Sequence, residues 1–405
     1  MDKPLSDLEK SGSIKLKRSI EDAGSIVISG DFCPLISNDN ELVIESLISQ
    51  FDDSIRREII KSELAITNLE CPLTDSKEPI AKTGPSLRAA KSHSRLIDEL
   101  GFDLVSLANN HILDYGSKGL METIESCSMN SLDVVGAGKN INEARSPHYT
   151  KVNKSRIAIL SGSEREFSIA SDRSPGACPL DILIDEKRIQ DAKTKADIVI
   201  YLYHGGNLYY EYPSPWMRNY CKNLVDLGAD TVICHHSHAM SGIEIYKDSP
   251  ICYGLGNFFF PWASKRPDSW YYGYLITLKI GNKSISGLEI LPYHQCMDGS
   301  TNVKILSPKK KRTTMKRIKE ISQHLLDDDL FNQEWGKYCN SRKASYISNI
   351  LQLSKLERIL YAKSGFLFNR RKKLNSLSKL LNIIRCESHR CTLLEVLKNE
   401  IHKEL

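Results

Sequence analysis

The chain has 405 residues, of which 41% are hydrophobic and 26% are charged, with a formal net charge of +5. This length allows two or three domains, or one large domain with appendages, and the composition is ordinary for a soluble globular protein. No stretch approaches the ~20 consecutive apolar residues of a membrane span, and the polar N-terminus lacks the apolar core of a signal peptide. We therefore expect a cytoplasmic protein, at most peripheral to the inner face of the membrane.

Charge is distributed unevenly along the chain. Residues 1–300 contain 32 Lys and Arg against 40 Asp and Glu, a net charge of −8, whereas residues 301–405 contain 23 against 10, a net charge of +13. We expect a polar lead-in over residues 1–23, a main domain over 24–300 and a basic helical region over 301–405. The 11 cysteines are odd in number and irregular in spacing, which favours reduced thiols over a disulfide framework.

Strands and helices alternate through most of the main domain. Apolar, β-branched runs predict strands at 24–31, 64–70, 102–108, 132–135, 156–160, 197–203 and 230–234, and helical spacing predicts helices at 40–61, 92–100, 118–129, 184–194 and 215–227. Five further strands without intervening helices, at 243–246, 250–253, 257–260, 271–280 and 285–291, predict an antiparallel flank. This order of elements favours a layered α/β domain.

The basic region differs from the main domain in that only helices are predicted in it. Apolar residues at helical spacing predict helices at 315–326, 346–361, 374–385 and 388–403. One interpretation is a solvated basic face on helices that pack against the core or a second subunit. The other is a docking surface for an anionic partner, such as a membrane leaflet or an acidic polymer. Nucleic acid is the least favoured partner because the region has no recognisable nucleic-acid motif or aromatic stacking platform.

Polar side chains of metal-ligand type follow five of the predicted strands. They are Asp31, Glu70, Asn110 with His111, His204, and His236 with His238. In open α/β sheets ligands bind just beyond the carboxyl ends of the strands, so we expect these residues to gather at one edge of a sheet. Alternate residues of an extended segment face the same way, so His236 and His238 would converge while His235 turns aside. In an isolated His-x-His, hydrogen bonds from the side chains to loop backbone are the more common arrangement. The polar residues at the other strand ends favour a metal site here.

The residue types indicate which metal the group would take. Carboxylates, imidazoles and one amide oxygen suit Mn, Fe or Zn, and the set is too rich in nitrogen for a dedicated Ca²⁺ site. These groups exceed the needs of one tetrahedral ion. A pair of ions about 3.5–4 Å apart, bridged by one carboxylate, would use them all.

The same residues resemble the capsule-synthesis protein CapA family over residues 24–260. That family is associated with poly-γ-glutamate and other capsule production and is related to calcineurin-like metallophosphoesterases. The motifs that carry the resemblance are Gly30-Asp31, Asn68-Leu69-Glu70, Asn109-Asn110-His111 with Asp114-Tyr115-Gly116, His204-x-Gly206, Gly228-Ala-Asp230, His235-His236-x-His238, Glu244-x-Tyr246, and Tyr253-Gly-Leu-Gly-Asn257-Phe258. The resemblance implies a metallophosphatase-like β-sandwich flanked by helices (αββα), with a C-terminal helical appendage.

The resemblance also implies roles for individual residues. Asp31 and His238 would hold one ion, Glu70 would bridge, and Asn110, His204 and His236 would hold the second. His111 would act as general acid or orient the leaving oxygen. Asp114 would fix the orientation of a nearby histidine. Arg88 would clamp an anionic substrate, although a surface or structural ion pair is an equal alternative for it.

Three departures from the family pattern concern the first ion and the substrate side. The opening Asp-x-His of metallophosphoesterases is Asp31-Phe-Cys33, which replaces an imidazole with either a thiolate ligand or, as we favour, a buried free cysteine. The usual Gly before the His cluster is Cys234. The family's His-Trp-Gly-x-Glu-Tyr is His204-Gly-Gly-Asn-Leu208-Tyr209, which removes a carboxylate that Glu211 could replace only after a loop shift.

Two functions fit these observations. The first is a metal-dependent hydrolase that acts on a phosphoester or related anionic bond during the synthesis of a bacterial surface polymer, using two divalent ions. The second is a non-catalytic, metal-containing component that binds the polymer or docks to a synthase complex or membrane through the basic region.

Overall fold

A computed structural model describes residues 8–16, 24–35, 41–350, 353–364, 370–385, 389 and 392–393. The chain forms two compact units, Met1–Asn332 and Gln333–Leu405. The first unit holds every predicted site residue.

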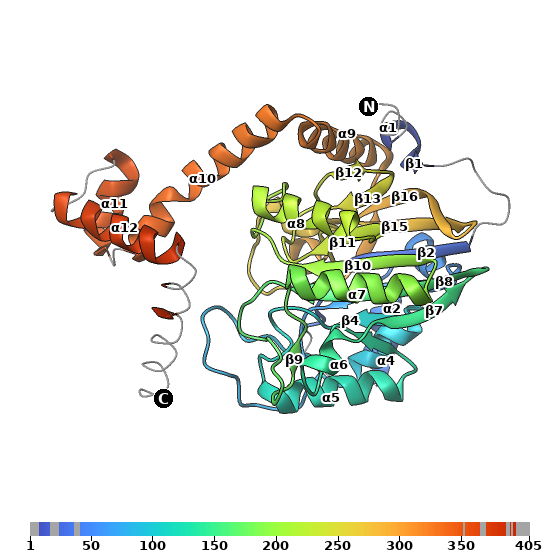
Figure 1. Cartoon of the computed structure of the whole chain (residues 1–405). Coiled ribbons are helices and arrows are strands. Elements are labelled where there is room, and N and C mark those ends of the chain that lie inside the picture. Colours follow the sequence, from blue (N-terminus) through green and yellow to red (C-terminus); the bar gives the residue numbers. More distant parts are fainter. Residues whose placement is uncertain are drawn as a thin grey trace. The chain divides into compact units, whose positions relative to one another are not determined.

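Two β-sheets form the centre of the first unit (Figure 1). The larger has nine strands: β1 (Ser13–Lys15), β16 (Ser284–Gln295), β15 (Tyr272–Gly281), β2 (Gly24–Phe32), β3 (Leu64–Leu69), β4 (Leu104–Ser106) and β5 (Asp133–Val135) in that order, with β14 (Asn257–Phe259) paired to β2 and β17 (Val303–Ile305) to β16. The smaller has six, in the order β12 (Ile243–Tyr246), β13 (Ser249–Cys252), β11 (Thr231–His235), β10 (Ile198–His204), β8 (Ser155–Ser163) and β7 (His148–Val152). A short pair, β6 (Ala137–Gly138) and β9 (Gly176–Ala177), stands apart.

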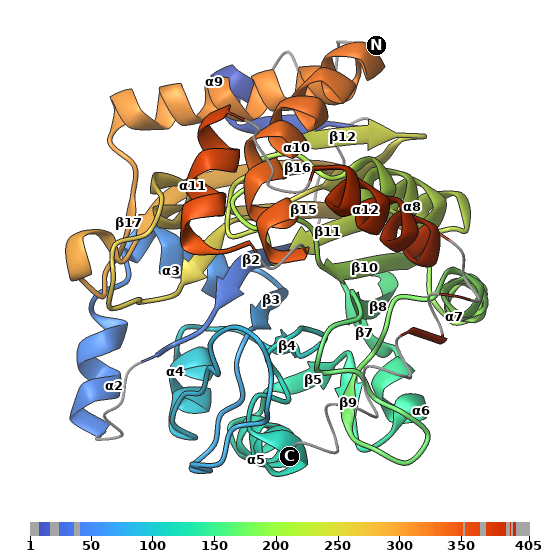
Figure 2. The ribbon, with the colours of Figure 1, turned by 90° about the vertical axis from the view of Figure 1, so that its left-hand side faces the viewer.

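Helices cover the outer faces of both sheets. The helices of the first unit are α1 (Leu8–Ser11), α2 (Glu41–Ile48), α3 (Asp53–Ile60), α4 (His93–Glu99), α5 (Gly116–Met129), α6 (Ile141–Arg145), α7 (Ile182–Lys195), α8 (Pro215–Asp226) and α9 (Pro308–Leu325), with 3₁₀ turns η1 (Asp268–Tyr271) and η2 (Met297–Gly299). Figure 2 shows the layers in order: α2, α3 and α4, the nine-stranded sheet, the six-stranded sheet, then α7 and α8. The predicted αββα sandwich with a C-terminal helical region is confirmed.

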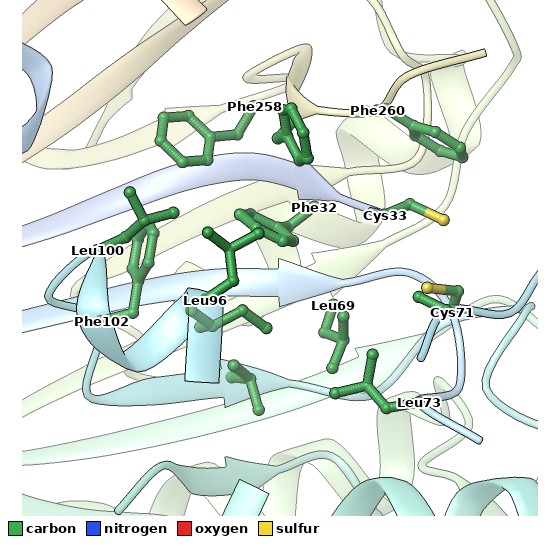
Figure 3. Packing of buried hydrophobic residues seen from close by; sticks show 14 of the residues in the cluster. Phe32, Cys33, Leu69, Cys71, Leu73, Leu96, Leu100, Phe102, Phe258 and Phe260 are labelled. Carbon is green, nitrogen blue, oxygen red and sulfur yellow. The ribbon is translucent and has the colours of Figure 1, made fainter. Parts of the chain in front are cut away.

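Alternation along the strands produces two apolar layers. Ile26 and Ile28 of β2 face the space between the sheets, where they meet Ile200 of β10, whereas Val27 faces the helices on the outside. Figure 3 shows the outer layer, in which Phe32 packs among residues of β3, α4 and the segment that begins with Phe258. Full burial of one such side chain contributes roughly 1.5–3 kcal/mol, so these layers hold the strand ends in place.

The helix predicted over residues 40–61 is wrong as one element, because it is broken into α2 and α3. Phe51 pairs with Val303 in a β-bridge, and the Asp52 backbone N–H donates to the Val303 carbonyl at 2.9 Å. The Asp52 side chain then accepts from the Ser54 N–H at 2.9 Å and caps α3. Tertiary pairing with β17 therefore overrides the helical spacing at this point.

The predicted antiparallel flank is correct only in part. β12 with β13 and β15 with β16 are antiparallel hairpins, as expected from the absence of helices between them. However, β13 is parallel to β11, and β14 is parallel to β2. The segment thus contributes to both sheets and does not form a separate antiparallel layer. The hairpin strand β7, beside β8, was not expected from the sequence.

The basic region is divided between the two units. β17 and α9 belong to the first, where α9 packs against β12 and β16. The helix α10 (Asp328–Ile350) begins in the first unit and continues into the second, which also holds α11 (Lys355–Ser364) and α12 (Arg370–Arg385). Of the helix predicted over 388–403, all but 389 and 392–393 lies outside the described residues. Within the described ranges, no helix is both long and apolar enough to span a bilayer.

Candidate metal centre

The predicted ligands gather where the carboxyl ends of the two sheets meet. The nine-stranded sheet contributes Asp31 within β2, Glu70 directly after β3 and Asn110 after β4, and the six-stranded sheet contributes His204 at the end of β10 and His236 and His238 after β11. The expectation that one sheet edge carries all of them is therefore wrong. Parallel strands within each sheet still bring their ends to one place, and sandwich packing faces the two sets toward each other.

Distances divide the side chains into two groups that share Glu70. In one group the donor atoms of Glu70, His204 and His236 all lie within 4.8 Å of one another, and in the other those of Asp31, Glu70 and His238 do. His204 Nε2 lies 3.5 Å from Glu70 Oε1, and His238 Nδ1 lies 3.2 Å from Asp31 Oδ2. These groups are the two sets that the resemblance implies, with the carboxylate of Glu70 common to both.

Asn110 joins the first of these groups through its amide oxygen. Asn110 Oδ1 lies 3.1 Å from His204 Nε2, and its Nδ2 donates to Glu166 Oε2 at 3.1 Å. The carboxylate of Glu166 therefore orients the amide so that the oxygen faces the imidazole. The six predicted ligands lie together, and their role as ligands stays a prediction.

The surroundings of Glu70 show whether the site fits a bound cation. Its side chain is fully buried, yet neither carboxylate oxygen accepts a hydrogen bond from any residue in the described part of the chain. A buried carboxylate that accepts no hydrogen bond is costly, and a cation bound between it and the neighbouring imidazoles would stabilise its charge. Together with three imidazoles, a second carboxylate and an amide oxygen, this donor set fits divalent transition metals.

The pKa shifts of three candidate ligands follow from burial and from their charged neighbours. Burial, and then the neighbouring Asp31 carboxylate, raise the pKa of Glu70 well above its ordinary value. Burial also acts to raise the pKa of Asp31, but the hydrogen bond and charge of His238 outweigh burial and lower it. Burial and the nearby His236 lower the pKa of His204 far enough to favour the neutral imidazole that a metal requires.

The loop after β11 reaches this geometry by an unexpected path. His236 and His238 have φ angles of 92° and 52°, so the segment is not the extended strand that alternation assumed. A non-glycine residue in the left-handed region is costly and persists only where surrounding contacts hold it. The backbone N–H of His236 donates to Asp31 Oδ2 at 3.1 Å, which is one such contact. His235 turns aside as predicted, and its Nε2 donates to the Ser29 carbonyl at 3.0 Å.

Two asparagines that carry no predicted role position the ligands. Asn68 Nδ2 donates to Asp31 Oδ1 at 2.8 Å and lies 3.3 Å from His204 Nδ1. Asn257 Oδ1 accepts from His238 Nδ1 at 2.9 Å. Asn68 precedes Glu70 by two residues, so the alternation of β3 could have placed both on one face. Asn257 belongs to one of the motifs that carry the resemblance, but its place beside His238 follows from the pairing of β14 with β2, which the motif does not reveal.

His111 and Asp114 form a buried cluster with Lys82. His111 Nδ1 lies 2.7 Å from Asp114 Oδ2, and the Lys82 ammonium forms an ion pair with Asp114 and lies 3.1 Å from His111 Nδ1. The Leu87 N–H also donates to Asp114 Oδ2, at 2.6 Å. Burial, although opposed by Asp114, lowers the pKa of His111. Asp114 thus contacts a histidine, and its role in orienting that histidine stays a prediction. Lys82 was missed because it lies in an irregular loop.

Three residues considered from the sequence, Arg88, Glu211 and Cys33, lie outside the two groups of candidate ligands. Arg88 is exposed, and its Nη1 donates to the Thr74 carbonyl while the guanidinium lies 5.5 Å from the ring of Tyr115. Glu211 forms an ion pair of 2.6 Å with Arg317 of α9, so it does not replace the missing carboxylate.

Cys33 lies in the outer apolar layer beside Cys71 (Figure 3). Burial and then Cys71 raise the pKa of the Cys33 thiol, which disfavours the thiolate that a metal would require. The buried free cysteine is therefore the better interpretation, as expected from the sequence. A substrate role for Arg88 stays a prediction.

Comparison with known proteins finds a family and several relatives. Residues 25–261 match the family described as "Bacterial capsule synthesis protein PGA_cap". The chain is 30% identical over 276 residues to "Capsule biosynthesis protein CapA" of Bacillus anthracis, covering 65% of this chain and 66% of that protein. It is 34% identical over 212 residues to "PGA biosynthesis protein CapA" of Bacillus subtilis (strain 168), covering 51% and 56%.

A third relative is a "Probable polyglutamine synthesis accessory protein" of Mycobacterium tuberculosis (strain CDC 1551 / Oshkosh), 29% identical over 210 residues that cover 48% of this chain and 55% of that protein. The chain thus spans between about half and two thirds of the length of these relatives. The match over residues 25–261 includes all six predicted ligands and both catalytic candidates. The chain belongs to the bacterial capsule synthesis protein family PGA_cap, which includes the CapA proteins.

Proposed function

We propose that the protein is a dinuclear metal-dependent hydrolase that acts on a phosphoester or related anionic bond in making or trimming a bacterial surface polymer. The observation that carries this proposal is the buried Glu70 carboxylate, which is shared by two groups of potential ligands and has no hydrogen-bond donor among the described residues. Membership of the capsule synthesis family supports the polymer context. The name of the Bacillus subtilis relative, a PGA biosynthesis protein, supports an anionic polymer such as poly-γ-glutamate as the substrate.

The chain's own residues would divide the work. Asp31 and His238 would hold one ion and Asn110, His204 and His236 the other, with Glu70 common to both. When bound, divalent cations supply Lewis acidity to the attacking water and to the phosphoryl or acyl oxygen that gains negative charge. Asn68 and Asn257 hold Asp31 and His238 by hydrogen bonds, so the ligands are positioned before substrate arrives.

His111 is positioned for proton transfer or for orienting the leaving oxygen. Asp114 and Lys82 engage its Nδ1, which leaves Nε2 as the ring nitrogen that can face the substrate. The charge of His236 is among the causes that lower the pKa of His111, so the ring lies within electrostatic reach of the centre. His111 would therefore donate a proton or a hydrogen bond to the leaving oxygen.

Metal content and turnover test this proposal together. The purified protein should contain stoichiometric Mn, Fe or Zn and should hydrolyse p-nitrophenyl phosphate or bis-p-nitrophenyl phosphate. Asn110→Ala and His204→Ala should lower turnover at least about 100-fold, because even the supporting residues of metal ligands contribute 10- to 100-fold. His148→Ala, which changes a histidine of β7 outside both groups, serves as the matched control and should retain wild-type turnover.

A non-catalytic role is the second candidate, and a charge cluster favours it. The first turns of α9 expose Lys309, Lys311 and Arg312, and no carboxylate in the described ranges pairs with these three side chains. Such a cluster could dock the protein to an anionic leaflet at the inner face of the membrane. Stoichiometric metal without mutation-sensitive turnover on several phosphoesters would favour this role over the hydrolase.

Vesicle co-sedimentation tests the docking surface directly. Replacing Lys309, Lys311 and Arg312 with glutamine should weaken binding to vesicles rich in phosphatidylserine about 100-fold, since each basic residue near the surface contributes about 1 kcal/mol. A control variant with glutamine at the exposed Lys139, Lys151 and Lys154 should bind as wild type does. Equal losses in both variants would refute a specific role for α9.

A further inference from the structure

An aromatic cluster lies directly beside the candidate metal ligand His238. The ring centroid of His238 is 4.8 Å from that of Trp270, 5.4 Å from that of Phe260 and 6.5 Å from that of Tyr209. Trp270 is buried, and its carbonyl accepts from Asn257, the residue that also contacts His238. The cluster and the candidate ligand are therefore held by the same contacts.

Arg266 inserts its guanidinium into this cluster. The guanidinium carbon lies 3.9 Å from the ring centroid of Trp262 and 5.2 Å from that of Trp270, and Nη1 donates to Tyr209 Oη at 3.4 Å. The Arg266 backbone N–H donates to Tyr271 Oη at 3.0 Å, which ties down the loop. Stacking of this kind orients the planar guanidinium group. The side chain therefore loses less conformational entropy when it binds a ligand.

The guanidinium of Arg266 forms no ion pair with the described residues, because none of their carboxylates lies within 4 Å of it. Its Nε is buried without a hydrogen-bond partner. The side chain as a whole is half-buried, so Nη2 and the second N–H of Nη1 are the donors left for a ligand. An oriented, unpaired guanidinium beside a cation centre is an arrangement that selects an oxyanion.

We propose that Arg266, with Trp262, Trp270 and Tyr209, forms a subsite that binds a carboxylate of the substrate next to the candidate metal centre. The inference rests on the proposed function, because it assigns a binding site to the part of the substrate that the candidate metal centre does not contact. A planar carboxylate matches the paired N–H groups at the end of a guanidinium. An acidic polymer carries such a group on every residue, so the subsite would position one unit while the bond to be cleaved lies at the centre. Arg266, and not the exposed Arg88, then supplies the specificity for an acidic substrate.

Binding can be measured without turnover. The probe is a pentamer of γ-linked glutamate, titrated into full-length protein in the presence of a chelator, with calorimetry and tryptophan fluorescence as readouts. Two of the four tryptophans belong to the subsite, so occupancy should change the emission. Arg266→Gln should weaken binding at least about tenfold, the effect of losing a charge-assisted hydrogen bond. Arg266→Lys should bind at an intermediate level, because an ammonium keeps the charge without the planar fork.

A matched control and a competing ligand sharpen the test. Arg342 of α10 also lies over an aromatic ring, that of Tyr338, but outside the first unit, so Arg342→Gln should bind the pentamer as wild type does. Urea unfolding confirms that the Arg266 variants are folded. An Arg266→Gln affinity equal to that of wild type, no binding by the wild type, or tighter binding of inorganic phosphate than of the pentamer would each overturn the proposal. Binding that depends on Arg266 in a protein that holds no metal and hydrolyses nothing would support the subsite and refute only the hydrolase.

Discussion

Replacing Glu70 with glutamine is expected to abolish metal binding at both groups while leaving the metal-free protein as stable as wild type, within about 1 kcal/mol. Both groups share this carboxylate, so its loss affects both at once. In the metal-free protein its oxygens accept no hydrogen bond from the described residues, and its neutral isostere therefore loses little. A ligand that is retained for metal binding should behave in this way, whereas a residue retained for the fold should not.

Urea unfolding with and without metal measures both parts of this expectation. At a Mn²⁺ concentration of 100 times the Kd of each site, the wild type should gain about 2.7 kcal/mol of unfolding free energy per bound ion, or about 5.4 kcal/mol for two ions, and Glu70→Gln should gain almost none. Glu125→Gln changes an exposed carboxylate of α5 and should respond to metal as wild type does. A Glu70→Gln protein that loses stability in chelator and still responds fully to Mn²⁺ would show that the carboxylate serves the fold.

Replacing Asp114 with alanine should have the opposite signature, with a large loss of stability that metal does not restore. The Asp114 and Lys82 side chains are 0% and 2% exposed, so the substitution leaves a buried ammonium without its carboxylate. Breaking one side of a buried ion pair costs about 3–5 kcal/mol. Turnover should fall as well, because the orientation of His111 depends on the same carboxylate.

A surface pair provides the control for Asp114. Lys91 and Asp75 lie 2.6 Å apart with side chains 43% and 58% exposed, so Asp75→Ala should change urea unfolding little. Adding Lys82→Met to the Asp114→Ala protein should recover part of the lost stability, because the uncompensated charge is then removed. If Asp114→Ala proves no more costly than Asp75→Ala, the cluster is not the buried anchor that its contacts indicate.

That the candidate ligands lie close together could be predicted, because each is tied to a local signal. Asp31, Glu70 and His204 end strongly apolar strands, and such runs indicate both the strand and the position of its carboxyl end. Which sheet each strand joins could not be predicted in the same way. Pairing depends on contacts between segments far apart in sequence, as when β14 and β15 join β2. The sequence therefore predicted a site at the edge of one sheet, whereas the candidate ligands lie where two sheets meet.

The residues that surround the ligands could not be predicted, for a related reason. Lys82 and Arg266 lie in irregular loops, and their environments are created by Asp114, Trp262 and Trp270 only after the chain has folded. The helical spacing of residues 40–61 likewise gave no sign of the helix break at Phe51, because that break depends on pairing with β17. Sequence patterns report local preference and burial, whereas these features arise from tertiary contacts.

The most direct test of the shared centre is an anomalous difference map from crystals of the protein grown with Mn²⁺. Two peaks are expected, one beside Asp31 and His238 and the other beside Asn110, His204 and His236, with Glu70 contacting both. Absence of peaks at saturating Mn²⁺, or peaks bound by other residues, would contradict the dinuclear centre and the hydrolase proposed from it.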